Sequence, residues 1–123
     1  MPCLVIKSGE QAGKYFQLTK RPLAGGRDPA TEIQIIDPKV SRRHFQVRLG
    51  NGGYCVRELR SKNGVFVNGV KITGEQPLRD GDEIKVGDTS LVYFEDEDPD
   101  RTNAVEQYRR GSRNLREDRT LSD

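Results

Sequence analysis

This chain of 123 residues has little cysteine, one histidine and no long apolar run. Its two cysteines, Cys3 and Cys55, are too few for a disulfide scaffold, and neither has a C-x-x-C metal or redox spacing. We expect both to be small buried apolar residues on strands, in a reducing compartment. No stretch reaches the roughly 18 consecutive apolar residues of a membrane span, and no secretory signal is visible. A soluble, intracellular, cytoplasmic protein is the expectation.

The lone histidine, His44, limits the chemistry that the chain can perform. It has no second histidine and no cysteine at metal-ligand spacing, and the nearest nucleophile is Ser41, three residues earlier. An enzyme that works through a nucleophile would need a base close to it. We therefore expect a structural histidine that holds a loop, and neither catalysis nor a metal or other cofactor.

Charge is divided unevenly along the chain. Residues 1–94 hold 15 Lys and Arg against 10 Asp and Glu, a net +5, while residues 95–123 hold 6 against 9, a net −3. The modest positive charge favours anionic partners without naming one. We expect one folded domain over residues 1–94. Residues 95–123 open with an acidic run and read as a charged, flexible tail or linker, with a partial helix over 104–110.

Short β-prone runs alternate with turn residues over most of the chain. Phe45, Val47 and Leu49 alternate with polar residues, the period of a half-buried strand. Because the chain has 13 glycines and no sustained helical periodicity before Glu95, an all-β sandwich or barrel is predicted. The expected strands are 3–7, 14–18, 23–26, 32–36, 44–49, 54–59, 65–67, 70–72, 83–86 and 89–94.

Three expected loops hold cationic and polar side chains where plain turns need only Gly and Asn. They are residues 25–28 (G-G-R-D), 37–44 (D-P-K-V-S-R-R-H) and 60–69 (R-S-K-N-G-V-F-V-N-G). Taken alone, an arginine after two glycines is typical of a solvated turn.

These loops resemble a known family. The motifs G-R at 26–27, S-x-x-H at 41–44 and N-G-x-x-x-N-G at 63–69 are similar to those of the forkhead-associated (FHA) domain. The motif L-x-D-G-D-x-I-x-x-G at 78–87 resembles the last hairpin of the same family. Each motif is weak alone, but four in order over residues 3–94 make a specific match. The resemblance implies an eleven-stranded FHA/SMAD-like β-sandwich with peptide-binding loops at one end.

The resemblance also implies roles for individual residues. Arg27 matches the arginine that reaches the phosphate, and Ser41 matches the serine that donates to a phosphate oxygen. Arg42 lies where many members contact phosphate or peptide backbone, and Asn63 matches the asparagine that holds the peptide main chain. The residues expected to support these loops are Gly26, His44, Gly64 and Asn68. The pair Asn68-Gly69 is explained by the tight turn of a hairpin alone.

Elementary chemistry agrees with those roles. A phosphate on threonine carries about −1.5 to −2 charges at pH 7 and has three strong acceptor oxygens, so it needs several converging donors. Arginine offers a planar charged fork, whereas lysine offers a point charge. Serine gives a short, directional donor, and asparagine donates and accepts at once, which suits an extended peptide backbone.

One position departs from the family pattern. Members often carry Ser or Thr directly before the N-G, and here that residue is Lys62. We expect Lys62 to act as a cationic phosphate ligand, with the alternative that Ser61 takes over part of the hydroxyl's role. Either leaves binding intact and alters the peptide preference.

The predicted function is a phosphothreonine-peptide-binding adaptor in Ser/Thr kinase signalling, whose partner is a kinase or its substrate. The alternative is a phospho-independent interaction or oligomerisation module on the same fold.

The cluster of Lys39, Arg42 and Arg43 also suggests a nucleic-acid patch, but it lacks interleaved aromatic residues. A phosphorylated Thr120, with Asp123 three residues later, would give a self-binding segment; an incidental threonine is the simpler interpretation.

Overall fold

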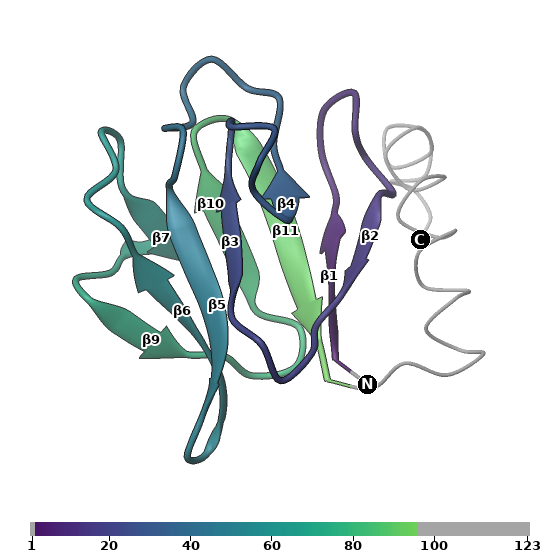
Figure 1. Cartoon of the computed structure of the whole chain (residues 1–123), viewed down its shortest axis with the longest axis vertical. Helices are drawn as coiled ribbons and strands as arrows, with labels where there is room; N and C mark the ends of the chain where they lie inside the picture. The colour runs from purple at the N-terminus through teal and green to yellow at the C-terminus, as the bar shows by residue number, and fades with distance from the viewer. Residues whose placement is uncertain (1, 96–123) are drawn as a thin grey trace, which may run out of the picture.

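The structure, a computed structural model, describes residues 2–95 as eleven strands in two sheets that pack face to face (Figure 1). The predicted all-β sandwich with eleven strands is confirmed. The tail expected over residues 95–123, the partial helix over 104–110 and Thr120 lie outside the described residues, apart from Glu95.

Each sheet is built from strands that are distant in sequence. The six-stranded sheet has the order β2 (Tyr15–Gln17), β1 (Cys3–Ile6), β11 (Thr89–Phe94), β10 (Glu83–Val86), β7 (Val65–Val67) and β8 (Val70–Lys71). The five-stranded sheet has the order β4 (Ile33–Gln34), β3 (Leu23–Gly26), β5 (Phe45–Gly50), β6 (Gly53–Glu58) and β9 (Glu75–Pro77). All pairs are antiparallel except β3 with β4.

The main core lies between the sheets and takes side chains from both. Leu4 of β1 and Leu91 of β11 come from the larger sheet, and Phe45 and Val56 come from the smaller one, all fully buried. Because side chains alternate across a strand, the predicted period of two over β5 places Phe45 and Val47 in this core. Leu49, the third residue of the same pattern, is exposed at the strand's end.

Tyr93 of β11 makes the stability of this core sensitive to alkaline pH. The ring is 2% exposed, and burial, with a smaller effect of Glu95, raises the pKa of its hydroxyl to about 12. Between the ordinary tyrosine pKa near 10 and this value, the unfolded chain loses a proton that the folded chain keeps. We therefore expect the urea midpoint to fall as pH rises from about 10 to 12, and to fall less in Tyr93→Phe. Parallel pH curves for the two proteins would contradict this.

Most strand predictions are confirmed to within one or two residues. The hairpins β1–β2 and β7–β8 and the strand β3 lie where the turn residues place them. β4 is shorter than the predicted 32–36, and β9 was not among the predicted ranges. Cys3 is buried as expected, but Cys55 is only half-buried, because it lies on the outward face of β6; the two cysteines are not joined in a disulfide. Within residues 2–95, no helix is long and apolar enough to cross a membrane.

Candidate functional site

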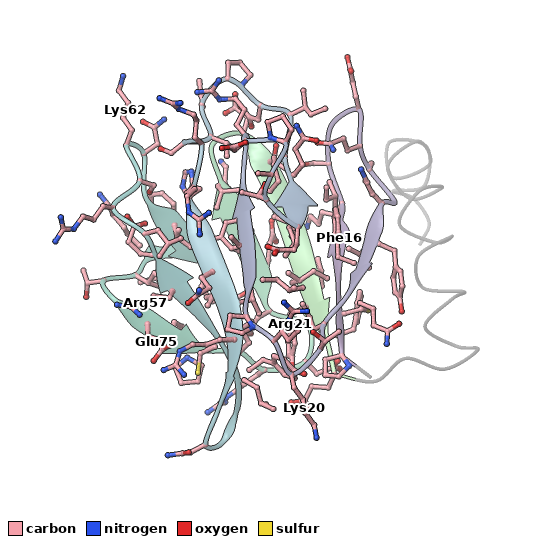
Figure 2. The ribbon with its side chains drawn as sticks, viewed as in Figure 1. Phe16, Lys20, Arg21, Arg57, Lys62 and Glu75 are labelled. Carbon is pink, nitrogen blue, oxygen red and sulfur yellow. The ribbon has the colours of Figure 1, made fainter. Side chains whose placement is uncertain are left out.

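Three loops meet at one end of the sandwich and form a depression of about 460 Å³. Figure 2 shows Lys62 at this end of the molecule, opposite the end that carries Lys20. The loops are those that follow β3, precede β5 and precede β7, which are the three that the sequence singled out. The residues that line the depression are Arg27, Pro38, Lys39, Val40, Ser41, Lys62 and Asn63.

Arg27 leaves the end of β3 and is fixed from two sides. Its backbone amide donates to the Ser41 carbonyl at 3.0 Å, and its Nε donates to the Val40 carbonyl at 2.9 Å. The Nε bond anchors one edge of the guanidinium, while the side chain as a whole is exposed. The hydrogen bond at Nε therefore fixes the side-chain conformation, and the two terminal guanidinium nitrogens face the depression.

Two glycines allow close approaches at the end of β3, Gly26 to the Ser41 loop and Gly25 to the Phe45 ring of β5. A Cβ on Gly26 would lie 2.1 Å from the Arg42 carbonyl oxygen, and one on Gly25 would lie 2.1 Å from the Phe45 ring. The expected loop-supporting role of Gly26 thus has a steric cause, since any side chain here meets backbone.

Ser41 and Asn63 each use part of their hydrogen-bonding capacity within the site. The Lys62 amide donates to Ser41 Oγ at 3.0 Å, so this oxygen acts as an acceptor and its hydroxyl hydrogen can be donated elsewhere. Asn63 Nδ2 donates to the Lys39 carbonyl at 2.8 Å. Its Oδ1 and second amide hydrogen are then the groups that an added peptide backbone would meet.

The site is electrostatically positive. Arg27, Lys39 and Lys62 all line the depression, and Lys39 also forms an exposed ion pair with Asp88, with Nζ 3.4 Å from Oδ2. A cation-lined surface concavity of this kind attracts an anion. Among residues 2–95, no group of three or more His, Cys, Asp or Glu is placed to hold a metal ion.

His44 ties two of the loops together from beneath. It is fully buried; the Ser41 amide donates to its Nδ1 at 3.0 Å, and its Nε2 lies 2.7 Å from the Gly64 carbonyl oxygen. Because Nδ1 accepts, Nε2 carries the hydrogen and donates to Gly64. Both ring nitrogens are therefore engaged with backbone.

Removing this ring should both destabilise the fold and loosen the site. His44→Ala leaves a cavity and two buried backbone groups without partners, which we expect to cost about 2–4 kcal/mol of unfolding free energy. His44→Gln, which can restore one of the two bonds, should lose less. Urea denaturation measures both; equal stability of His44→Ala and the parent protein would contradict the role assigned to the ring.

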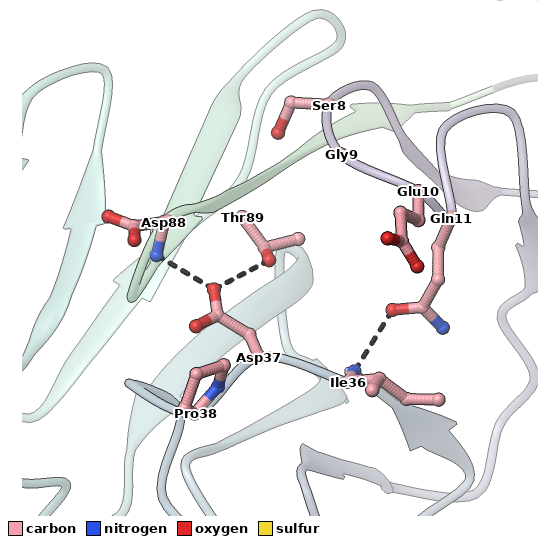
Figure 3. Close-up of a pocket in the computed structure, with 9 residues that line it drawn as sticks. All are labelled: Ser8, Gly9, Glu10, Gln11, Ile36, Asp37, Pro38, Asp88 and Thr89. Carbon is pink, nitrogen blue, oxygen red and sulfur yellow. Dashed lines mark hydrogen bonds between the residues drawn. The ribbon is translucent and has the colours of Figure 1, made fainter.

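Asp37 is a further supporting residue, which was expected only as a member of its loop and not in any role of its own. Its Oδ2 accepts from the Asp88 amide and the Thr89 hydroxyl, both at 2.8 Å; Figure 3 draws both bonds. Burial opposes the charged carboxylate, but these bonds and one from the Lys39 amide outweigh it, and the pKa of Asp37 is lowered. The Asp-Pro pair that starts this loop is the sequence signal that could have suggested such a turn.

Three other residues that the sequence analysis singled out lie outside the depression. Arg42 is exposed and does not line the depression; its carbonyl accepts from the Asp28 amide at 3.1 Å. Ser61 donates to Glu58 and accepts from the Gly64 amide, so its hydroxyl holds the loop and is not among the lining groups. Asn68 lies at the other end of β7 from Gly64, where it bonds to Asp82 and Glu83. Asn68 therefore supports the turn before β10, away from the three site loops.

Gly64 has the backbone that its place in the motif requires. Its φ of 88° is in the left-handed region, and a Cβ would lie 2.8 Å from Lys71 Cε. The turn it allows directs Asn63 into the depression and the Gly64 carbonyl toward His44.

Comparison with known proteins gives this arrangement a family. Residues 24–87, which contain all three loops, match the FHA domain family. The chain belongs to the FHA domain family.

Two curated relatives are named as an inhibitor and a regulator. The chain is 39% identical over 91 residues to an oxoglutarate dehydrogenase inhibitor of Corynebacterium efficiens, covering 74% of this chain and 63% of the relative. It is 37% identical over 91 residues to the glycogen accumulation regulator GarA of Mycolicibacterium smegmatis, covering 74% of this chain and 57% of that one. The chain thus spans less than two-thirds of the length of either.

Solved FHA domains share the fold. One, from a study of phosphothreonine-dependent FHA domain interactions, has a TM-score of 0.71 at 27% identity and covers 78% of this chain and 97% of its own. The N-terminal FHA domain of S. cerevisiae Rad53p, in complex with a phosphothreonine peptide, has a TM-score of 0.68 at 27% identity and covers 77% and 93%.

Proposed function

We propose that this FHA domain binds phosphothreonine-containing segments of partner proteins, as an adaptor in Ser/Thr kinase signalling. The observation that carries the proposal is the convergence of Arg27, Ser41, Lys62 and Asn63 on one depression. The Rad53p domain bound to a phosphothreonine peptide supports it, since its fold matches this one.

In this proposal each lining group has a separate task. The Arg27 fork, held at Nε, takes two phosphate oxygens through its terminal nitrogens, and the Ser41 hydroxyl donates to a third position. Lys62 adds charge without fixed geometry, in the place where the family often has a hydroxyl. Asn63 holds the peptide backbone beside the phosphate. Arg42 lies outside the depression, so its positive charge would contact only a bound peptide that extends beyond it.

In this proposal the domain binds its ligand and catalyses no reaction. His44, the only histidine, is fully buried with both ring nitrogens on backbone partners, so it is not positioned as a general base. The names of the relatives, an inhibitor and a regulator, point to the same kind of role. We propose an intracellular partner that is either a Ser/Thr kinase or an enzyme that such a kinase controls.

A degenerate phosphothreonine peptide library, titrated by fluorescence anisotropy, tests this function. Binding should saturate with the phosphorylated library and be lost after phosphatase treatment. A Thr→Glu version of a selected peptide should bind at least roughly tenfold more weakly, because a planar monoanion satisfies fewer of the converging donors. Equal affinity for the dephosphorylated library would favour the phospho-independent module instead.

A further inference from the structure

A second hollow, of about 360 Å³, lies directly beside the depression that Arg27 lines, and Pro38 belongs to the lining of both. Its walls come from three loops (Figure 3): residues 8–11 between β1 and β2, residues 36–38 at the start of the loop before β5, and residues 88–89 at the β10–β11 turn. The first and last of these loops are not among the three that form the depression. A ligand held in the depression therefore has a further concave surface within reach.

Hydrogen bonds hold the walls of the second hollow together. Asp37, which is 6% exposed, accepts through Oδ2 from the Asp88 amide and the Thr89 hydroxyl, and so joins the loop before β5 to the β10–β11 turn. The Ile36 amide donates to Gln11 Oε1 at 2.9 Å, which joins the same loop to the β1–β2 loop. The hollow is therefore formed before a ligand arrives, and little loss of conformational freedom opposes its use.

The lining of the second hollow combines an apolar wall with one unpaired negative charge. Ile36 is 71% exposed, the most exposed large apolar side chain among the described residues, and it lines the hollow together with Pro38. Figure 3 shows the Glu10 carboxyl pointing from its loop into the hollow. Within residues 2–95 this carboxylate has no hydrogen bond and no ion pair, whereas that of Asp88 is paired with Lys39, with 3.4 Å between Oδ2 and Nζ.

This lining discriminates among the side chains that a ligand can offer. A purely apolar side chain would take water from the Glu10 carboxylate without giving it a partner, and an acidic side chain would be repelled. Lysine and arginine carry a cationic head on a long apolar stem. The stem can lie on Ile36 and Pro38 while the head meets Glu10, so a basic side chain satisfies both parts of the lining.

We propose that the second hollow binds a lysine or arginine side chain of the phosphorylated segment, which makes Glu10 a specificity-determining residue. This inference rests on the proposed function, since the phosphate in the depression is what places the segment here. Because the two concavities share Pro38 and an extended chain advances about 3.3 Å per residue, the basic residue lies within about four positions of the phosphothreonine. The domain then recognises a phosphate and a cation together.

Scanning one phosphopeptide tests this specificity. In a peptide selected from the phosphothreonine library, Ala, Arg, Lys and norleucine are placed in turn at each position up to four residues before and after the phosphothreonine. Fluorescence anisotropy should show that Arg and Lys raise the affinity over Ala by about threefold to tenfold at one position or two adjacent ones, since an exposed ion pair adds modestly and the stem adds buried area. Norleucine has the stem of lysine without its charge and should raise the affinity by less than about twofold. Equal gains from norleucine and lysine would overturn the inference.

Two glutamate variants show whether the gain comes from Glu10. The readout within each variant is the ratio of the affinities for the Arg and Ala peptides. Glu10→Gln should lower this ratio to less than about twofold, and Glu10→Arg should reverse the preference, so that a Glu peptide binds better than the Arg peptide. The matched control, Glu95→Gln, removes the same charge from the far end of β11 and should keep the parent ratio. Equal ratios in Glu10→Gln and Glu95→Gln would show that general attraction explains the gain, and the inference would be wrong.

A measurement on the unmodified chain does not depend on how the variants fold. Amide chemical shifts are recorded with the Arg peptide and with the Ala peptide bound, and their differences should centre on residues 8–11 and on Ile36. Differences centred elsewhere would refute the assigned hollow. If neither phosphopeptide binds, the proposed function and this inference fail together; if both bind with equal affinity at every scanned position, only this inference fails.

Discussion

Arg27→Ala should lose phosphothreonine-peptide affinity by roughly tenfold to a hundredfold, which corresponds to about 1.5–3 kcal/mol for one charge-assisted contact. Arg27→Lys should recover little of this. A lysine has no equivalent of the Nε that donates to the Val40 carbonyl at 2.9 Å, and its ammonium cannot grip two oxygens as a fork. Isothermal titration of one selected phosphopeptide against each variant gives the affinities.

The control for this experiment is Arg43→Ala. Arg43 is exposed, belongs to the same loop as Ser41 and carries the same charge, but it does not line the depression. Its removal should change the affinity by less than about threefold through long-range attraction alone, and that small effect should shrink in high salt. If Arg43→Ala weakened binding as much as Arg27→Ala, general electrostatic attraction would explain the affinity and the assigned contact would be wrong.

Gly26→Ala should strongly destabilise the domain, although it adds only one methyl group. The added Cβ would lie 2.1 Å from the Arg42 carbonyl oxygen. That oxygen belongs to backbone, and the two segments are held together there by the bond from the Asp28 amide to Arg42 and by that from Arg27 to Ser41. We expect a loss of about 2–4 kcal/mol in the free energy of unfolding, measured by urea denaturation. Surviving folded protein should also bind phosphopeptide more weakly, because β3 carries Arg27.

Gly52→Ala is the matched comparison. Gly52 lies in the turn between β5 and β6, where an added Cβ meets nothing within 4 Å, and its φ is not in the left-handed region. This substitution should change stability by less than about 0.5 kcal/mol. Equal urea midpoints for the two alanine variants would show that the close approach at Gly26 does not constrain the fold.

Local chemistry explains why much of this fold was predictable from sequence. The hairpins β1–β2 and β7–β8 are announced by glycine-bearing turns, and the alternation of β5 follows from its burial on one face. β9 could not be found this way, because Glu-Gln-Pro has no strand propensity and its pairing with β6 comes from the assembled sheet.

The site was predictable in membership more than in geometry. The motifs that resemble the FHA domain grouped Arg27, Ser41 and Asn63, and the fold brings them to one depression. The sequence does not tell which way Ser61 points, nor that Asn68 lies at the far end of β7. Both depend on the direction in which a side chain leaves a turn, and its hydrogen-bond partner sets that direction. The partner is Glu58 for Ser61 and Asp82 for Asn68. The sequence does not single out either partner.

Gln11 explains why a partner would meet this end of the molecule through loops. Its side-chain amide donates to the Gln34 carbonyl at 3.2 Å and accepts from the Ile36 amide at 2.9 Å (Figure 3 shows the second bond). That pair of bonds is what a residue on an adjacent parallel strand would make opposite Ile35. One side chain thus imitates a missing strand along the open edge of β4. With those two edge groups occupied, a strand added here by a ligand or by another copy would first have to displace the Gln11 side chain.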